Sequence, residues 1–466
     1  MTESASYVYY EYPDNVGERL SYGENHPERK ALFKILEEST KKKGYELKRL
    51  EELADSIEEK VDTAKSFPDE SFAYLGLENI EPYKGTATFQ TLLGKEILSM
   101  SKRFRKGDIV FAGLRPYLNK VHLVEQTEAI GSAELFVIKP KEELVIPDYL
   151  LKYLLSDLTL TQTKWILTGC SYPRLNPDDF KNLKIIKPTR KEEQEQILKR
   201  IEAYEKNAQQ KDDETLKLSN RCRNVILEKL EIEMPSPNLF EVTSTDFYSD
   251  WDIGDSGRLD FVFHHPWMDK IRVLLSSFKT TKLGDLIEPQ IEYGINASGK
   301  EQGSIPFINI QNMGIDGRLK LAEIGYIDTA EDSKLVHGRD ILLSRSRLVG
   351  VCNLVTEKED GFSFGSYILR LRTRKDSDVP PEYIVSFLNS DLGQAQIRML
   401  ETGAFGKNIN TRQIKEIKVP LPHYLEDIGE LVSEIQKMWR ELDESEAETE
   451  KLWTQSRKKF AEVLLE

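Results

Sequence analysis

The sequence contains two related halves, and this duplication constrains the fold more than any other feature. Pro147-Asp148-Tyr149-Leu150 matches Pro381-Glu382-Tyr383-Ile384 at an offset of 234 residues. The same offset continues without a gap through the identities Leu154/Leu388, Ser156/Ser390, Asp157/Asp391, Gln162/Gln396, Asn176/Asn410, Lys184/Lys418 and Ile201/Ile435. Chance similarity does not hold one register over such a length. We therefore expect one structural unit to occur twice.

Both halves have the same internal order. Each begins with short apolar runs between Gly, Pro and Asn turn signals, such as 108–111, 135–138 and 367–370, which predict strands. Short helices that open with proline are predicted over 147–155 and 381–388. A long polar segment with helical periodicity follows in each half, and Met234-Pro235-Ser236-Pro237 indicates a linker between the halves.

The two long segments have the apolar spacing of a coiled coil. Ile428, Val432, Ile435, Trp439 and Leu442 alternate steps of four and three residues, and the first long segment has the corresponding seam Ile197, Ile201, Tyr204, Ala208, Leu218, Cys222 and Val225. Both seams are polar in the middle, at Lys211 and Thr215 and at Glu446 and Thr449. We expect these polar centres to meet across an antiparallel pair. The alternative is two unrelated amphipathic surface helices.

These patterns predict a mixed α+β fold with pseudo-two-fold symmetry. Two domains, each with a mixed β-sheet and short helices, are joined by two long antiparallel coiled-coil helices. The predicted bounds are 1–188 for the first domain, 189–233 for the first long helix, 234–421 for the linker and second domain, and 422–466 for the second long helix.

The charge distribution matters more than the net charge of -14, which by itself disfavours nucleic-acid binding. Residues 95–122 hold seven basic and two acidic residues, whereas residues 424–466 hold six basic and twelve acidic residues. Locally basic surfaces are therefore expected away from the second long helix. No apolar run is long enough to span a membrane, no signal peptide is expected, and three separated cysteines favour the cytoplasm.

Several of the usual signatures of catalysis are absent from the sequence. There is no GxxxxGK[ST] phosphate loop and no HExxH, and the cysteines form no CxxC pair. Asn176-Pro177-Asp178-Asp179 lacks the proline and aromatic residue of the Asn-Pro-Pro-aromatic motif of adenine methyltransferases, so it predicts a helix start with Asp caps. We expect no catalytic residue, no metal and no cofactor on this chain.

A duplicated domain suits a protein that contacts two DNA half-sites, with the long helices as a spacer between them. Base edges are read by amide and guanidinium side chains on loops that reach a groove. The candidate DNA-binding residues in the first half are Arg115, Tyr117, Asn119, Lys120 and Arg174. Those in the second half are Asn309, Gln311, Asn312, Arg345, Arg347, Lys407, Asn408 and Asn410. Turn caps and surface ion pairs are the competing explanation for each of them.

The order of these parts resembles the specificity subunits of type I restriction-modification systems. The resemblance rests on the stretches 106–111, 114–120, 168–176, 183–188 and 192–197, which look like the end of a target-recognition domain that runs into a helical spacer. It implies that the chain binds double-stranded DNA with a bipartite sequence. It also implies two methyltransferase subunits, which carry S-adenosylmethionine and methylate adenine at N6, and ATP- and Mg-dependent restriction subunits that can join them.

The second half departs from the family pattern at 421–427, which lacks the Glu-Gln pair found at Glu193-Gln194. This departure puts partner contact at that end in doubt. Two alternatives stay open at this point. The chain could serve a fused nuclease-methyltransferase, or it could be an acidic DNA mimic that blocks a restriction system. The DNA sequence that is recognised does not follow from these residues.

Overall fold

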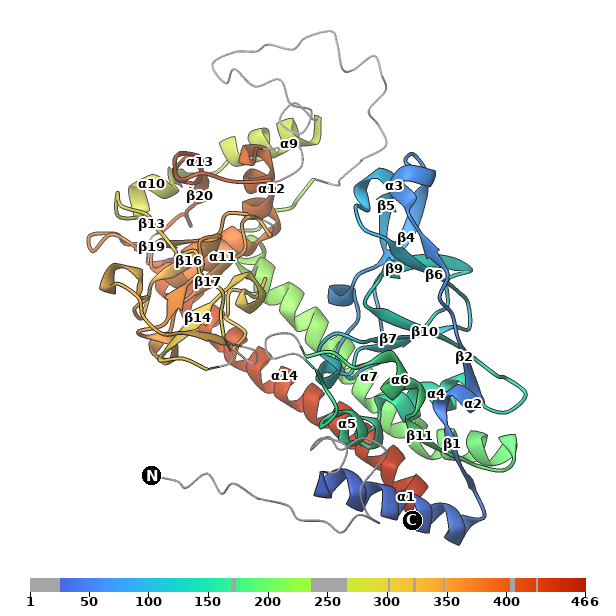
Figure 1. Ribbon diagram of the computed structural model, residues 1–466. Helices are drawn as coiled ribbons and strands as arrows, with labels where there is room; N and C mark the ends of the chain where they lie inside the picture. The colour runs from blue at the N-terminus through green and yellow to red at the C-terminus, as the bar shows by residue number, and fades with distance from the viewer. Residues whose placement is uncertain are drawn as a thin grey trace. The chain divides into compact units, whose positions relative to one another are not determined.

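The computed structural model describes residues 26–168, 173–235, 266–300, 302–321, 324–346, 348–402, 407–424 and 426–466. The chain forms two compact units. Unit 1 comprises Met1–Lys211 and Glu448–Glu466, and unit 2 comprises Asp212–Ala447. Each unit therefore includes part of α7 (Lys191–Lys229) and part of α14 (Asp427–Leu465), the two long helices of Figure 1.

Besides these helix segments, unit 1 contains a mixed set of strands and short helices. The strands are β1 (Glu46–Arg49), β2 (Ala54–Ser56), β3 (Lys60–Val61), β4 (Ser71–Leu75), β5 (Gln90–Leu93), β6 (Ser101–Arg105), β7 (Ile109–Ala112), β8 (Val121–Leu123), β9 (Glu128–Ser132), β10 (Leu135–Pro140) and β11 (Lys184–Lys187). The helices are α1 (Pro27–Lys43), α2 (Leu50–Leu53), α3 (Thr63–Ser66), α4 (Pro147–Leu155), α5 (Asp157–Thr163) and α6 (Pro177–Lys181), with short 3-10 turns η2 (Leu77–Asn79), η3 (Gly94–Glu96) and η4 (Pro116–Leu118).

Unit 2 repeats this order. Its strands are β12 (Thr280–Lys282), β13 (Glu292–Tyr293), β14 (Ile305–Ile308), β15 (Gly325–Ile327), β16 (Ile341–Ser344), β17 (Cys352–Leu354), β18 (Ser363–Phe364), β19 (Ile368–Leu371) and β20 (Lys418–Pro420). Its helices are α9 (Pro266–Ser276), α10 (Leu283–Leu286), α11 (Pro381–Asn389), α12 (Asp391–Leu400) and α13 (Thr411–Lys415), with 3-10 turns η5 (Ile310–Asn312), η6 (Asp332–Lys334) and η7 (Glu357–Glu359).

The sheets of the two units have matching topology. A four-stranded sheet has the order β2-β10-β7-β8 in unit 1 and β13-β19-β16-β17 in unit 2. A second sheet differs in size, with five strands in unit 1 (β3-β6-β9-β4-β5) and three in unit 2 (β15-β14-β18). Each contains one parallel pair, β4 with β9 in unit 1 and β14 with β18 in unit 2. A short antiparallel pair, β1-β11 or β12-β20, leads into the long-helix segment. The mixed α+β prediction and the duplication are both confirmed.

Strand periodicity explains why the four-stranded sheet of unit 1 is buried on both faces. Successive strand residues point to opposite faces. On β7, Ile109 and Phe111 join the core beneath the helices, while Val110 and Ala112 join the core that the five-stranded sheet covers. On β16 of unit 2, Leu343 and Leu342 divide in the same way. A run that is apolar at every position is therefore a central strand of this fold.

Buried polar side chains hold the same frame in both units. The hydroxyl of Tyr149 donates to the carbonyl of Ile186 at 2.6 Å, and that of Tyr383 donates to Pro420 at 2.6 Å. The amide of Gln162 bonds both backbone groups of Lys184, at 2.9 and 2.7 Å, and Gln396 does the same to Lys418 at 2.8 Å each. Tyr149 and Tyr383, like Gln162 and Gln396, are identical residues at the repeat offset of 234. These sequence identities therefore preserve the same buried hydrogen bonds, here called the frame, in both units.

Each unit is completed by the C-terminal part of a long helix. Phe460 of α14 is 1% exposed in unit 1, where its ring lies 5.7 Å from that of Tyr149. Ile226 of α7, which corresponds to Phe460 at the offset of 234, is fully buried in the core of unit 2. The N-terminal helix α1 also holds the end of α14, because Lys42 and Lys43 donate to its last carbonyl groups.

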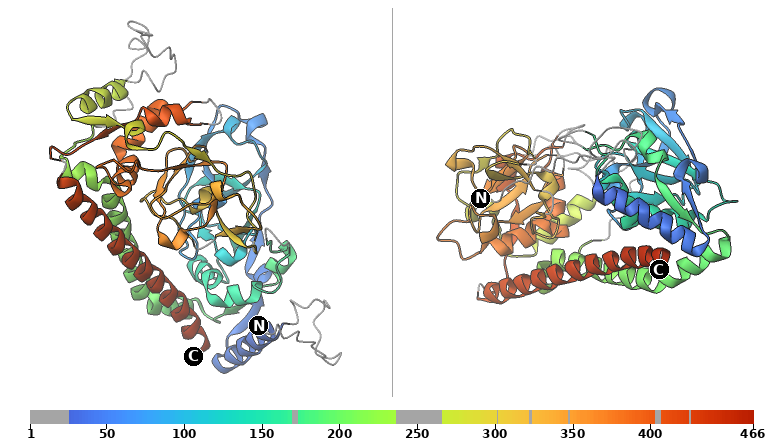
Figure 2. Two further views of the ribbon diagram at one scale, coloured as in Figure 1. Left: turned by 90° about the vertical axis from the view of Figure 1, so that its left-hand side faces the viewer. Right: turned by 60° about the horizontal axis from the view of Figure 1, so that its bottom comes forward.

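The long helices pair in antiparallel orientation within each unit, as predicted. In unit 1, Arg200 bonds Glu466 and Lys211 bonds Glu448, so the contacts run in opposite directions along the two helices. In unit 2, Thr215 bonds Ser445 at 2.7 Å and Cys222 donates to the carbonyl of Met438 at 3.6 Å. Figure 2 shows the two helices side by side. The alternative of two unrelated surface helices is wrong.

The predicted contacts of the polar centre need one correction. The sequence predicts that Lys211 and Thr215 face Glu446 and Thr449. In the structure, Lys211 binds Glu448 at 2.6 Å and Thr215 binds Ser445. The carboxylate of Glu446 is bound by Arg318, which comes from the β-rich part of unit 2, at 3.0 Å. Heptad spacing did not identify this competing partner, because it concerns only the two helices.

We predict that the helix ends contribute strongly to stability. Phe460→Ala should lower the free energy of unfolding by about 3–5 kcal/mol and Ile226→Ala by about 2–5 kcal/mol, because each leaves a cavity in a core. Leu216→Ala on α7, where the side chain is 63% exposed, is the control and should cost less than about 0.5 kcal/mol. Urea unfolding measures all three. Equal effects of the three substitutions would contradict this packing.

Candidate nucleic-acid interface

The predicted reading loops form matching loop pairs, one in each unit. In unit 1 the loop after β7 bonds the segment before α6, because Leu175 donates to the carbonyl of Gly113 at 2.9 Å and Arg115 donates to Pro173 at 2.7 Å. In unit 2, Ile409 donates to Arg345 at 3.0 Å in the corresponding place. Two segments that are far apart in sequence therefore present their side chains together.

The loop of residues 115–120 in unit 1, the reader loop, has an unusual backbone. Arg115 has a φ of 49° and Asn119 a φ of 45°, both in the left-handed region, on either side of the turn η4. This conformation is costly for residues with a Cβ atom. Tyr117 lies at the centre of the turn and is 41% exposed, and Arg115 is half-buried. The loop thus presents an aromatic ring and a guanidinium from a constrained backbone.

Two of the predicted residues in this loop face inward. Asn119 is fully buried, and its amide donates to the carbonyl of Leu155 at 2.7 Å. The ammonium of Lys120 donates to the carbonyl of Leu77 at 2.8 Å. Both side chains therefore support the loop in this structure, and Arg115 and Tyr117 are the better placed to contact a ligand.

Acidic partners bind two of the predicted cations. Arg174 forms a two-point contact with Glu134, at 3.0 and 3.3 Å, and this contact raises the pKa of its guanidinium. Lys407 of unit 2 lies 2.5 Å from the carboxylate of Glu401. An anionic ligand must compete with these carboxylates, so the two loops carry less free positive charge than the sequence indicated.

In unit 2, Arg345 lies beside an aromatic ring that the sequence analysis did not select. Its guanidinium carbon is 5.1 Å from the centre of the Tyr293 ring, within the range of a cation–π contact. The exposed fraction of Tyr293 is 40%. The neighbouring Ser346 forms a β-bridge with Asn408. The predicted Arg347 lies outside the described residues.

The remaining candidates in unit 2 divide between exposed and structural residues. Asn312 is 2% exposed, where its amide donates to the carbonyl of Lys320 and its oxygen accepts from the backbone of Asn309. Gln311, between them, is exposed. Asn410 is exposed but also caps α13, because its side chain accepts from the backbone of Gln413 at 2.9 Å. Asn408 is half-buried.

The sequence analysis also missed Tyr83 and Glu134. Tyr83 donates a hydrogen bond to the carbonyl of Tyr117 at 2.6 Å, and Glu134 binds Arg174. Neither residue lies in a repeat identity or in a basic stretch. Their importance comes from tertiary contacts across about forty residues of sequence, which no local pattern contains.

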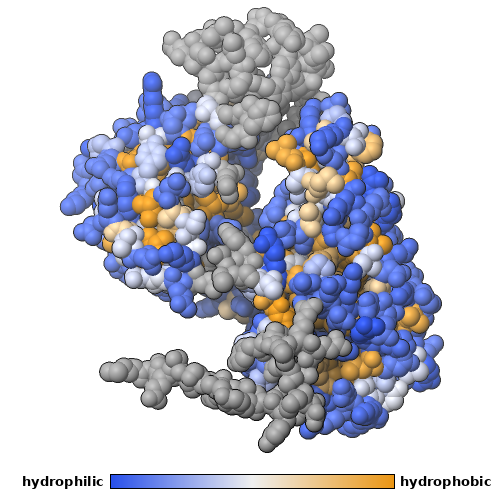
Figure 3. Space-filling model, viewed as in Figure 1, coloured by the Kyte–Doolittle hydropathy of each residue, from blue (hydrophilic) through white to orange (hydrophobic). Residues whose placement is uncertain are grey.

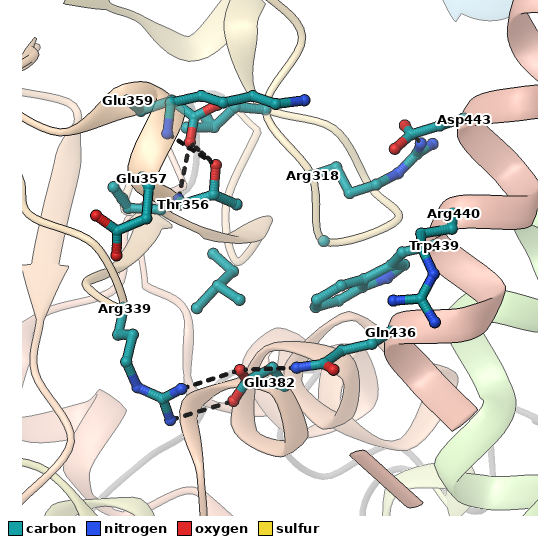
Figure 4. Close-up of a pocket in the computed structure, with 15 residues that line it drawn as sticks. Arg318, Arg339, Thr356, Glu357, Glu359, Glu382, Gln436, Trp439, Arg440 and Asp443 are labelled. Carbon is teal, nitrogen blue, oxygen red and sulfur yellow. Dashed lines mark hydrogen bonds and ion pairs between the residues drawn. The ribbon is translucent and has the colours of Figure 1, made fainter. Parts of the chain in front are cut away.

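A cavity of about 370 Å³ lies where α14 meets the β-rich part of unit 2 (Figure 4). Trp439 forms one wall, and its indole nitrogen donates to the carbonyl of Asp316 at 3.0 Å. Arg339 and Gln436 both bind Glu382, at 3.2 Å each. These polar groups bind one another, and the hydroxyl of Thr356 donates to the carboxylate of Glu359 at 2.6 Å in the cap of η7. The cavity is therefore a place where the β-rich part of unit 2 holds α14.

Other chemistry-bearing groups serve the fold. Asn176 accepts from the backbone of Asp178 at 2.9 Å and caps α6, so the predicted helix start is confirmed. The predicted Asp caps are wrong, because Asp178 and Asp179 lie in the first turn of the helix. Burial raises the pKa of the Cys222 thiol to about 11 and that of Cys352 well above its usual range, which keeps both thiols neutral. Among the described residues, no group of His, Cys, Asp and Glu is placed to hold a metal ion.

The surface is mostly hydrophilic on the face shown in Figure 3, where apolar side chains form separate groups. Exposed aromatic residues include Tyr117 in the reader loop and Tyr293 and Tyr367 in unit 2. In the part of the chain that the structure describes, no helix has the length and apolar character needed to cross a membrane.

Comparisons with known proteins find similarity in the first part of the chain. Residues 42–218 match the type I restriction modification DNA specificity domain. The type I restriction enzyme EcoDI specificity subunit of Escherichia coli is 27% identical over 188 residues, which are 39% of this chain and 40% of that protein. The chain thus aligns with about two fifths of the length of this curated relative.

Solved structures are also similar to this chain, and these comparisons cover more of its length. The HsdS subunit from Thermoanaerobacter tengcongensis is 19% identical, with 90% of this chain and 96% of that chain covered and a TM-score of 0.36. The type I restriction-modification S subunit from M. genitalium is 13% identical, with 89% and 96% covered and a TM-score of 0.35.

We predict that the left-handed backbone at Arg115 can be detected by a pair of substitutions. Arg115→Gly should be more stable to unfolding than Arg115→Ala by about 1 kcal/mol, because only glycine adopts this conformation without steric strain. Both variants lose the same guanidinium, so the difference isolates the backbone. Thermal or urea unfolding measures it. An alanine variant as stable as the glycine variant would show that residue 115 has ordinary backbone geometry.

Proposed function

We propose that this chain, whose residues 42–218 belong to the type I restriction modification DNA specificity family, is the DNA-reading subunit of such a complex and does no chemistry itself. The observation that supports the proposal most strongly is the duplicated frame. The same four-stranded sheet, the same short antiparallel pair and the same buried hydrogen bonds occur in both units, and each unit presents its own loop pair. A protein with two such readers suits a bipartite DNA site.

The two loop pairs carry different side chains, so we propose that the two half-sites differ in sequence. Unit 1 presents Arg115 and Tyr117, whereas unit 2 presents Arg345, Lys407 and the exposed Gln311. Arginine and glutamine side chains are suited to bidentate contacts with guanine and adenine edges in the major groove. In the proposal, Asn119 acts as a buried support for the loop of unit 1, and Asn312 supports the segment that carries Gln311.

The resemblance to the family supplies the proposed partners. Two methyltransferase subunits carry S-adenosylmethionine and methylate adenine, and restriction subunits that use ATP and Mg can join them. These cofactors belong to the partner subunits. The complex works on double-stranded DNA in the cytoplasm. In this proposal the bounds 1–188 and 234–421, which end just after β11 and β20, delimit the two target-recognition domains.

Two other functions are weaker candidates. The match to a DNA specificity domain favours DNA reading over an acidic DNA mimic, although the net charge of -14 suits a mimic. A specificity subunit that serves a fused nuclease-methyltransferase has the same reading function, and only its partner differs. Binding of the purified complex to double-stranded DNA separates a reader from a mimic, because a mimic competes with DNA and does not bind it.

We predict that each unit controls one half-site. Arg115→Ala should relax specificity in the first half-site, and Arg345→Ala or Arg347→Ala should do so in the second, each by about 1–3 kcal/mol for a base contact. Methylation mapping of DNA from cells that carry each variant measures the sequence preference at both half-sites. Lys120→Ala is the companion variant, because its ammonium supports the loop from inside.

The pattern of loss distinguishes the roles of these residues. A phosphate contact weakens binding to all sequences alike and reduces the salt dependence, whereas a base contact changes the preference at one position. Parental methylation by the Arg115, Arg345 and Arg347 variants would show that these loops do not read DNA.

We also propose that the paired helices set the gap between the half-sites, because each helix begins in one unit and ends in the other. Insertion of four residues after both Lys211 and Ala447 lengthens each helix by about 6 Å. This length corresponds to about two base pairs at 3.4 Å per pair. The variant should recognise the same half-sites across a gap that is longer by about two base pairs.

Methylation mapping measures this gap. Insertion into only one helix is the matched control, because it places the Lys211–Glu448 and Thr215–Ser445 pairs out of register and should reduce assembly instead of changing the gap. Full activity of the double insertion at the parental gap would show that these helices do not set the spacing.

A further inference from the structure

Three residues with left-handed backbone meet at the reader loop of unit 1. Tyr83 has a φ of 64°, and it contacts the loop that contains Arg115 and Asn119. Its backbone N–H donates to the carbonyl of Asn119 at 3.1 Å, and its hydroxyl donates to the carbonyl of Tyr117 at 2.6 Å. Left-handed backbone persists in residues with a side chain only where surrounding contacts impose it. Tyr83 supplies such contacts at both the middle and the end of the loop.

Further hydrogen bonds hold the loop to the rest of unit 1. Asn119 and Lys120 donate to carbonyl groups of Leu155 and Leu77 in the body of unit 1. The Tyr117 carbonyl accepts from Tyr83, while the Tyr117 side chain is 41% exposed. The loop is therefore held from the protein side and leaves an aromatic side chain at the surface.

Tyr83 is in turn held by a long helix. The guanidinium carbon of Arg457, on the part of α14 that belongs to unit 1, is 4.7 Å from the centre of the Tyr83 ring. The side chain of Arg457 is 14% exposed, and its Nε lies 3.9 Å from a carboxylate oxygen of Asp157. A cation–π contact strengthens when the cation is removed from water. Contacts thus run without interruption from α14 through Tyr83 to the reader loop.

We propose that Tyr83 and Arg457 are positioning residues that fix the reader loop of unit 1 for the first half-site. The inference rests on the proposed function, because it takes this loop to be the DNA contact. Pre-organised loops avoid the cost of ordering on binding, and a reading side chain must be held within a fraction of an ångström. The end of α14 therefore determines how accurately the first half-site is read.

The test compares four variants in the full complex with its methyltransferase and S-adenosylmethionine. Tyr83→Ala removes the hydroxyl bond to Tyr117 and the ring contact with Arg457 but keeps the backbone donor to Asn119. Tyr83→Phe removes only the hydroxyl, and Arg457→Met removes the charge but keeps an aliphatic chain. Arg223→Met is the matched control, because Arg223 holds the same repeat position on α7 and pairs with Asp391 at 2.9 Å in unit 2. Methylation rates are measured on the cognate site and on sites with one base changed in either half.

Tyr83→Ala and Arg457→Met should reduce discrimination in the first half-site by about tenfold, within the range of a single base mismatch. Neither variant should change discrimination in the second half-site. Tyr83→Phe should lose less discrimination in the first half-site than Tyr83→Ala, because its ring remains over Arg457. Arg223→Met should leave the first half-site as in the parent. A general loss of folding would affect both half-sites alike, so the ratio between them separates positioning from stability.

The outcomes are decisive even where a variant folds poorly. If Tyr83→Ala does not assemble, Tyr83→Phe and Arg457→Met decide the question. The inference is overturned if both of these keep parental discrimination in the first half-site while Arg115→Ala loses it. If Arg115→Ala also keeps parental discrimination in the first half-site, the loop does not read DNA. The proposed positioning role is then overturned as well, because it depends on that reading role.

Discussion

The burial of a helix end in each unit is the interaction on which the rest of the structure depends. Phe460 from α14 fills the core of unit 1 beside Tyr149 and Tyr153, and Ile226 from α7 fills the core of unit 2. Removal of either side chain from its core leaves a cavity whose cost is a large fraction of a typical domain stability. Each unit therefore needs residues from both halves of the sequence, and the long helices belong to the cores as well as to the spacer.

The duplicated frame and the divergent loops separate stability from recognition. The frame uses the same buried contacts in both units, such as the Tyr149 and Tyr383 hydroxyls, because a buried carbonyl must find a donor. Exposed loop side chains such as Tyr117 differ between the units, whereas Asn119 is buried and supports its loop. In the proposed function, this division allows each reader to change its sequence preference without loss of the fold, and it lets one chain read two different half-sites.

Much of this architecture could be predicted from the sequence, because repeats and periodicity report buried faces. The repeat located the two units, and the helix predicted at 147–155 is α4. The heptad pattern predicted the antiparallel pair but not the partner of Glu446, since Arg318 comes from outside the helices. The loops could be located, yet the inward direction of Asn119 and the pairing of Arg174 with Glu134 could not. Both depend on tertiary neighbours far away in sequence.

The central claim is that two different readers on one chain recognise one bipartite site. Long-read methylation mapping of DNA from cells that carry this chain with its methyltransferase tests it most directly. The account predicts adenine methylation within a motif of two unlike half-sites separated by a fixed, unspecified gap. Methylation in a single continuous motif, or at two identical half-sites in inverted orientation, would contradict it.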